Sequence, residues 1–135
     1  MKHQGGCHCG AVRYEVGGQP KHVTLCHCTD CRKSAGAPAV AWAAFAEDDF
    51  MLLQGELTNF QSSSIARRGF CPRCGTGITY RNDSELPGIV DIQSATLDDP
   101  DAMPVQAHIQ TAERIGWMAH AHDLPQFERF PEIPE

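Results

Sequence analysis

The chain has 135 residues, seven cysteines, a formal net charge of −6 and 41% hydrophobic residues. This length and composition are typical of one globular domain with its own core, and the negative charge disfavours nucleic acid and anionic membrane surfaces as partners. No apolar run is long enough to span a membrane, and residues 1–6 lack the apolar stretch of a signal peptide. We therefore expect a single cytoplasmic domain over residues 1–135.

The first cysteine motif, Cys7-His8-Cys9-Gly10, is predicted to open a strand that continues to residue 16. Period-two alternation puts Val12 and Tyr14 on one face, so Cys7 and Cys9 share the opposite face, where their sulfurs can converge on one ion. By the same alternation His8 lies on the apolar side and is expected to pack rather than to bind metal. A C-x-C motif alone is a weak signal and needs a second pair of cysteines.

The second motif places Cys26, Cys28 and Cys31 within six residues. Residues 22–28 are predicted as a strand with Cys26 and Cys28 on one face and His27 on the other, again as a packing residue. A short helix is expected over residues 29–35, ending at Gly36, with Cys31 in its first turn, where free N–H groups and the helix dipole favour a thiolate. Arg32 and Lys33 then either offset the charge of metal-bound thiolates or are simply solvated.

The middle of the chain is strand-rich. Residues 38–45 are predicted as a central strand, residues 50–55 as another, and residues 57–61 and 65–70 as a hairpin. The hairpin leads into the third motif, Cys71-Pro72-Arg73-Cys74-Gly75, which has the form of a zinc knuckle with a glycine suited to positive φ. A redox C-x-x-C of thioredoxin type would be followed by a helix, whereas residues 76–81 alternate like a strand.

The last third of the chain contains two further predicted strands, over residues 88–97 and 105–111. The tail from Ile115 carries Trp117 and several prolines, and we expect it to pack across the sheets.

Seven thiols divide into a set of four and a set of three. Dense cysteine clusters in a reducing compartment are more often metal ligands than disulfides, and an odd number fits a disulfide framework poorly. A structural zinc site has four protein ligands, whereas a catalytic one keeps three and leaves a position open. The hypothesis is therefore two Zn²⁺ ions per chain, one structural and one catalytic.

The three cysteine motifs and the segment from His108 through Trp117 to Pro125, in this order, resemble the glutathione-dependent formaldehyde-activating enzyme family, which includes centromere protein V. The resemblance covers almost the whole chain and implies a mainly β fold, a β-tent of antiparallel sheets around a structural zinc. It also implies the two ligand sets: a structural set of Cys7, Cys9, Cys71 and Cys74, and a catalytic set of Cys26, Cys28 and Cys31.

The activity implied by the resemblance joins glutathione to formaldehyde to give S-hydroxymethylglutathione, and in reverse it is that of a carbon–sulfur lyase. A zinc held by three thiolates suits this chemistry, because a substrate thiol entering the open position would lose its proton and could attack an aldehyde held beside it. The expected partners are thus a small thiol and an aldehyde. The alternative is a non-catalytic binding module with two structural zincs, in which a histidine such as His27 or His108 closes the second site.

Overall fold

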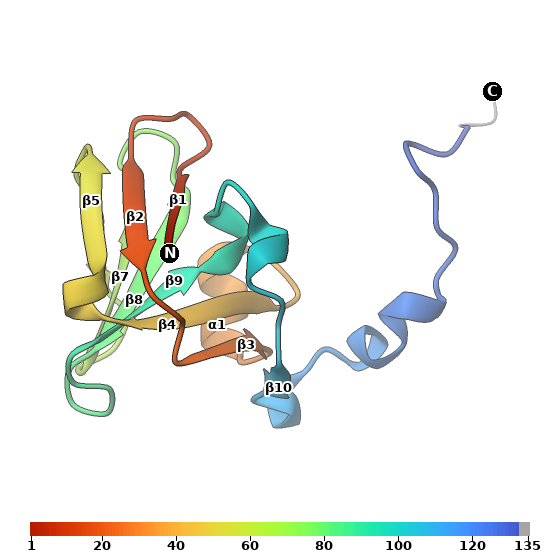
Figure 1. Ribbon diagram of the computed structural model, residues 1–135. Coiled ribbons are helices and arrows are strands. Elements are labelled where there is room, and N and C mark those ends of the chain that lie inside the picture. Colours follow the sequence, from red (N-terminus) through yellow and green to blue (C-terminus); the bar gives the residue numbers. More distant parts are fainter. Residues whose placement is uncertain (133–135) are drawn as a thin grey trace.

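The computed structural model describes residues 1–132 and contains two β-sheets, one α-helix and several short 3₁₀ segments (Figure 1). The smaller sheet is antiparallel and has the order β1 (Lys2–Gly6), β2 (Arg13–Gly17), β5 (Phe50–Gln54). The larger sheet has the order β10 (Ala107–Ile109), β3 (His22–Cys26), β4 (Val40–Ala46), β9 (Ile89–Gln93), β8 (Gly77–Asn82), β7 (Ala66–Phe70), β6 (Thr58–Gln61). The prediction of a mainly β fold is confirmed.

The remaining elements are short. The helix α1 (Thr29–Ala35) follows the second cysteine motif and ends at Gly36, whose φ of 63° explains the need for glycine there. These are the predicted limits of the helix. The 3₁₀ segments are η1 (Glu47–Asp49), η2 (Ser94–Thr96), η3 (Pro100–Ala102), η4 (Thr111–Glu113) and η5 (Gly116–Asp123). None of the helices in the described part of the chain combines the length and the apolar character needed to cross a membrane.

The main hydrophobic core lies between the two sheets. It includes the apolar face of β2, with Tyr14 and Val16 fully buried, and it receives Ala43 and Phe45 from β4. Val90 and Ile92 of β9 are also fully buried in this cluster. The prediction of a central strand over residues 38–45 is confirmed in position, since β4 lies between β3 and β9.

The opposite face of the larger sheet carries polar and aromatic side chains. Trp42 of β4 alternates with Ala43, so it points away from the core, and the strand register aligns it with Thr24 and Gln93. Two residues further along β4, and therefore on the same face as Trp42, Ala44 aligns with Asp91, which in turn aligns with Tyr80. The sheet therefore separates the apolar core from a second face, on which the candidate site is built.

One prediction about local structure is wrong. The first cysteine motif is not part of a strand: residues 7–12 form the connection between β1 and β2, closed by hydrogen bonds from Cys7 N to Val12 O (3.1 Å) and from Gly10 N to Cys7 O (3.2 Å). The strand pairs of the two sheets are antiparallel, as the family resemblance implies, except that β10 runs parallel to β3. A parallel partner comes from far along the chain, and local alternation contains no information on its direction.

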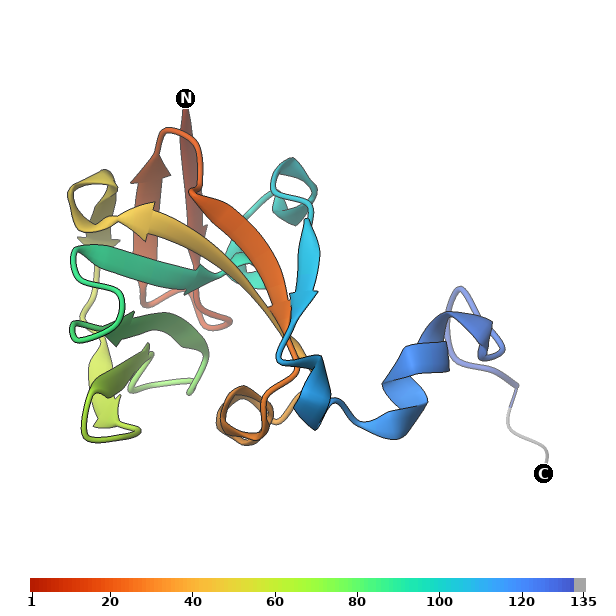
Figure 2. The same ribbon diagram turned by 90° about the horizontal axis from the view of Figure 1, so that it is seen from below.

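The tail does not pack across the sheets as expected. Beyond η4 the chain leaves the two sheets, and both views show it extending away from them (Figures 1 and 2). The side chains of Trp117, Leu124 and Phe127 are 54%, 55% and 62% exposed. Backbone hydrogen bonds within this segment are local, such as Met118 N to Ile115 O. Aromatic content alone therefore did not predict burial here.

Candidate metal centres and adjoining cavity

Cys7, Cys9, Cys71 and Cys74, which we call the quartet, come together from two turns. Their sulfurs all lie within 4.8 Å of one another, with 3.6 Å between Cys7 and Cys9 and 3.9 Å between Cys9 and Cys71. Four sulfurs placed about 2.3 Å from one tetrahedral ion would be about 3.8 Å apart, whereas a disulfide would need about 2.05 Å. The donor set and its spacing thus fit a closed four-sulfur metal site.

Backbone N–H groups in both turns point at the quartet sulfurs. Val12 N donates to Cys7 Sγ at 3.2 Å, and Cys74 N donates to Cys71 Sγ at 3.4 Å. Gly75 adopts a φ of 82°, which is the positive value expected for the knuckle glycine. N–H donors of this kind stabilise the thiolate form that a metal requires.

Thr76 links the two turns of the quartet. Its hydroxyl accepts a hydrogen bond from His8 N at 3.1 Å and lies 3.2 Å from Cys74 Sγ. The pKa of Cys74 is lowered to about 5, and the hydrogen bond with this hydroxyl is the largest cause. His8 itself is exposed and is not part of a cysteine cluster, so it neither packs in the core nor lies among the candidate ligands.

Cys26, Cys28 and Cys31, which we call the trio, lie where β3 passes into α1. Cys26 ends the strand, and Cys28 caps the helix by accepting the N–H of Cys31 at 3.3 Å. The three sulfurs lie within 4.8 Å of one another, and no further cysteine, histidine or carboxylate among residues 1–132 joins the group. A metal held by the trio would therefore keep a coordination position that no described side chain fills.

The thiols of the trio differ in acidity. The pKa of Cys31 is lowered to about 5, first by hydrogen bonding with Cys26 and then by contacts with Cys28 and Arg68, while burial opposes these effects. The pKa of Cys26 is raised, first by its hydrogen bond with Cys31 and then by burial. The trio thus holds a thiolate readily at Cys31, and binding of a metal to all three sulfurs would release protons.

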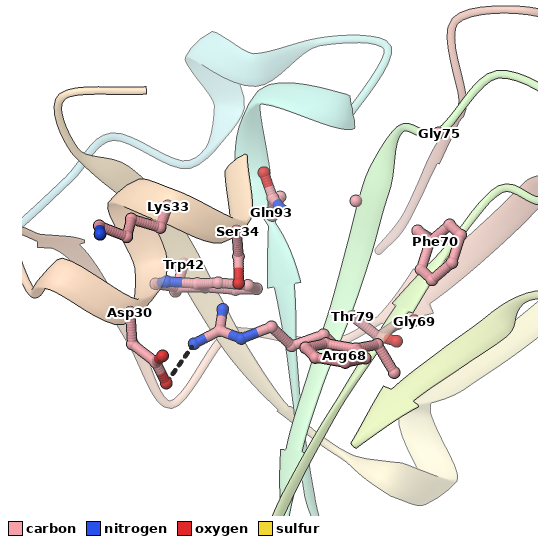
Figure 3. A pocket seen from close by; sticks show the side chains of 12 residues that line it. Asp30, Lys33, Ser34, Trp42, Arg68, Gly69, Phe70, Gly75, Thr79 and Gln93 are labelled. Carbon is pink, nitrogen blue, oxygen red and sulfur yellow. Dashed lines mark hydrogen bonds and ion pairs between the residues drawn. The ribbon is translucent and has the colours of Figure 1, made fainter. Parts of the chain in front are cut away.

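The cation that reaches the trio is Arg68 of β7. Its Nη2 lies 3.6 Å from Cys31 Sγ and 3.4 Å from Asp30 Oδ2. The guanidinium carbon is 4.9 Å from the ring centre of Tyr80 and 5.9 Å from that of Trp42. Figure 3 shows Arg68 reaching toward Asp30 beside the Trp42 ring. The local sequence does not indicate that this arginine belongs to the site, because its place depends on the pairing of β7 with β8.

The two basic residues next to the trio in sequence have other positions. Arg32 donates to the backbone oxygen of His27 at 3.3 Å, to Thr29 Oγ1 at 3.0 Å and to the backbone oxygen of Glu113 at 3.4 Å. These bonds tie the helix to the loop before it and to η4. Lys33 lines the wider cavity described below. Arg32 was expected either to offset the charge of metal-bound thiolates or to be solvated. It does neither, and its hydrogen bonds give it a structural role instead.

Two neighbouring cavities open on this face of the sheet. The one beside the trio has a volume of about 330 Å³ and is lined by all three trio cysteines together with Trp42, Tyr80, Asp91 and others. The wider one, about 540 Å³, shares Asp30, Trp42 and Arg68 with it and extends past Lys33 and Ser34 to Gly75 (Figure 3). Both volumes are in the range of small-molecule sites.

The histidines proposed as possible ligands are engaged with each other. Nε2 of His27 lies 2.9 Å from Nδ1 of His108, and the two rings are stacked with centres 5.1 Å apart. His27 is completely buried, as expected for a packing residue. Neither ring belongs to the metal-binding geometry of the trio within the described chain. The pair instead fastens β10 to the loop that carries the trio.

Asp91 is a further residue of this cavity, and it was not among the site residues predicted from the sequence. It is 7% exposed, and burial raises its pKa to about 6. The signal was available: Asp91 is a lone carboxylate within an apolar strand, where a charged residue is rarely placed without a partner or a ligand.

These features define a class of protein: a mainly β fold with two cysteine clusters that could each hold a metal ion, one of which opens on a cavity. Comparison with known families agrees with this description. The family model of the glutathione-dependent formaldehyde-activating enzyme matches residues 2–113. The chain belongs to this family.

Individual relatives support the assignment. A Halomonas elongata protein named "Putative glutathione-dependent formaldehyde-activating enzyme" is 29% identical over 124 residues, which cover 85% of this chain and 78% of the relative. A Schizosaccharomyces pombe protein named as an uncharacterized lyase is 27% identical over 79 residues, 58% of this chain and 57% of its own length. The crystal structure of a Rhodobacter sphaeroides protein has a TM-score of 0.63 and 27% identity, covering 78% of this chain and 98% of that one.

Proposed function

We propose that the chain is a zinc-dependent carbon–sulfur lyase that acts on the adduct of a small thiol with an aldehyde, such as S-hydroxymethylglutathione formed from glutathione and formaldehyde. The observation that carries this proposal is the contrast between the two clusters. The quartet forms a complete set of four sulfurs, whereas the trio has three and lies on a cavity of about 330 Å³. Family membership and the names of two relatives agree with it.

The donor chemistry fits zinc at both clusters. Thiolate sulfur is a preferred zinc ligand, and soft, sulfur-rich sites select a thiol in the open position over a carboxylate. In the trio, Cys26, Cys28 and Cys31 would hold the catalytic ion. When bound there, zinc would supply a Lewis acid that favours loss of the substrate's thiol proton. The quartet of Cys7, Cys9, Cys71 and Cys74 would hold the structural ion.

The side chains of the cavity would support the reaction by shielding, charge compensation and proximity. Trp42 and Tyr80 form aromatic walls whose ring centres are 5.9 Å apart, and such walls limit the access of water to a reacting aldehyde. Arg68 stacks on these rings and faces Cys31, so its charge compensates part of the negative charge of a thiolate-rich site. Holding thiol and aldehyde together in this small volume supplies proximity.

The first test is direct binding of a thiol. Protein loaded with Co²⁺ should show stronger thiolate-to-metal absorption when glutathione is added, because a fourth sulfur enters the coordination shell. Binding should tighten as pH rises toward the pKa of the free thiol. Cys28→Ser should lose this response, and Ser84→Ala, at an exposed turn position, should keep it. A spectrum indifferent to every small thiol tried would favour the binding module instead.

The second test concerns the reaction. The uncatalysed addition of glutathione to formaldehyde is fast, so the measurement is exchange between free and adduct forms at equilibrium by NMR. The metal-loaded protein should accelerate this exchange, and Cys28→Ser should abolish the acceleration while Ser84→Ala retains it. Thiol binding without faster exchange would keep the metal site but reject formaldehyde as the partner.

A further inference from the structure

The cavity beside the trio contains a buried carboxylate that forms no ion pair within the described chain. Asp91 is 7% exposed, and its side chain forms no hydrogen bond or ion pair among residues 1–132, although the nearby His22 lowers its pKa against the larger effect of burial. It lines the same cavity as the three trio cysteines. A buried carboxylate without a hydrogen bond or ion pair is costly, so its presence in the wall of this cavity points to a ligand that it contacts.

The strand register explains why Asp91 faces the cavity. Its neighbours in sequence, Val90 and Ile92, are completely buried in the main core, so period-two alternation directs Asp91 to the other face of the sheet. Across the strands it aligns with Ala44 on one side and with Tyr80 on the other. Because Ala44 is small, it leaves the carboxylate open to the cavity.

Several other charged and titratable groups lie around Asp91. Those that line the cavity from β3, α1 and the loop before it, β7 and β8 are His22, Cys26, Cys28, Asp30, Cys31, Arg68 and Tyr80. The guanidinium of this set, that of Arg68, is paired with Asp30 and Cys31, whereas His22 lowers and Cys31 raises the pKa of Asp91. Burial brings the pKa of Asp91 to about 6, so both of its protonation states are accessible near neutral pH.

We propose that Asp91 is the general acid–base catalyst of the thiol–aldehyde reaction, an inference that rests on the proposed function. In the cleavage direction the carboxylate takes the proton of the adduct hydroxyl. The electron pair of that O–H bond forms the second carbon–oxygen bond of the aldehyde, and the carbon–sulfur pair leaves on sulfur as a thiolate. In the direction of synthesis the thiolate attacks the carbonyl carbon, and the protonated Asp91 gives its proton to the oxygen.

The experiment compares Asp91→Asn with wild type, both loaded with metal, by equilibrium exchange NMR with glutathione and formaldehyde. Removal of a general acid–base should slow exchange by about 100-fold or more. Thiol binding, followed by the Co²⁺ absorption, should stay within about twofold, because Asp91 is not in the trio. The matched control is Asp48→Asn, at an exposed position of η1, which should behave as wild type in both measurements. Asp91→Ser, a second variant without the carboxylate, decides the result if Asp91→Asn does not fold.

The outcomes separate this inference from the proposed function. If wild type accelerates exchange and the carboxylate-free variants are equally fast, Asp91 is not the catalyst, and the lyase proposal stands. If the variants lose thiol binding in parallel with exchange, Asp91 binds the ligand instead, and the inference is overturned. If wild type itself does not accelerate exchange, the proposed function fails, and the role of Asp91 fails with it.

Discussion

Asp91 is expected to reduce the stability of the folded protein. Burial raises its pKa to about 6 from an ordinary value of 3.8, so between these values the folded state binds more protons than the unfolded state. The free energy of unfolding contributed by this residue therefore falls as pH rises from about 4 to about 6. Above pH 6 the buried carboxylate is charged, and it lowers the free energy of unfolding by on the order of 1–3 kcal/mol.

The corresponding prediction is that Asp91→Asn makes the protein more stable at pH 7 by on the order of 1–3 kcal/mol. The gain should shrink by about half at pH 5, because the wild-type carboxyl is then largely protonated in the folded state. Urea unfolding of variant and wild type at both pH values measures the difference, in which the titration of other groups cancels. Asp48→Asn should show no such trend. A gain that is the same at both pH values would contradict the assigned cause.

Buried residues in the middle of the strands show what local sequence can and cannot predict. The face of Tyr14 and Val16 follows from alternation alone, and it is buried as predicted. Arg68 and Asp91 also follow the alternation of their strands, but their importance depends on which strands lie beside them. That information is not local, so the sequence reveals the cysteines of the site more easily than the side chains that complete it.

At the scale of elements, β10 is a short strand with a specific position. It pairs with β3 in parallel, with Ile109 aligned with Cys26, and Ile109 O accepts the N–H of His27 at 3.1 Å. The contact between His27 and His108 adds a side-chain bond to this pairing. The strand thereby holds the loop of the trio against the sheet.

We expect His108→Ala to destabilise the protein by about 1–2 kcal/mol, because it leaves Nε2 of the buried His27 ring without its hydrogen-bond partner. Nδ1 of His27 already lacks a partner in the described chain. His120→Ala is the matched control: it removes an exposed histidine from η5 and should change stability by less than about 0.5 kcal/mol. Chemical denaturation measures both. An effect of His108→Ala as small as that of the control would show that the pair does not stabilise the loop.

The helix and the turns illustrate two kinds of local prediction. The limits of α1 follow from a capping residue and a glycine that are both local, and the prediction of its range is confirmed. The first cysteine motif was predicted as strand because its residues alternate, but the turn is closed by backbone hydrogen bonds around Cys7 and by Gly10 at a φ of 81°. Alternation over only a few residues does not distinguish such a turn from a strand.

At the scale of the whole molecule, the two clusters have different positions in the fold. The quartet joins the β1–β2 connection to the β7–β8 turn, and so it links the smaller sheet to the larger one. The trio lies within one continuous segment at the end of β3. Loss of the quartet should therefore affect the fold, whereas loss of the trio should affect mainly the cavity.

The prediction is that Cys74→Ser lowers the melting temperature by at least about 10 °C more than Cys28→Ser. Structural zinc contributes up to roughly 10–16 kcal/mol in small zinc domains, while whole domains are stable by only about 5–15 kcal/mol. Even a fraction of that contribution corresponds to a shift of this size for a chain of this length. Elemental analysis should find close to two zinc ions in wild type and one in Cys31→Ser. Equal melting temperatures for the Cys74 and Cys28 variants would contradict the assignment of the two sites.

The parallel pairing of β10 with β3 also affects how the protein can be made. His27 and His108 are 81 residues apart in the chain, and ribosomes add about 5–20 residues per second, so the trio emerges about 4–16 s before the strand that holds its loop. Cys9 likewise waits for Cys71, which lies 62 residues later. During these seconds the nascent chain carries free thiols that no fold protects. Synthesis is therefore the stage at which an oxidant or a mismatched metal has the easiest access to these sulfurs.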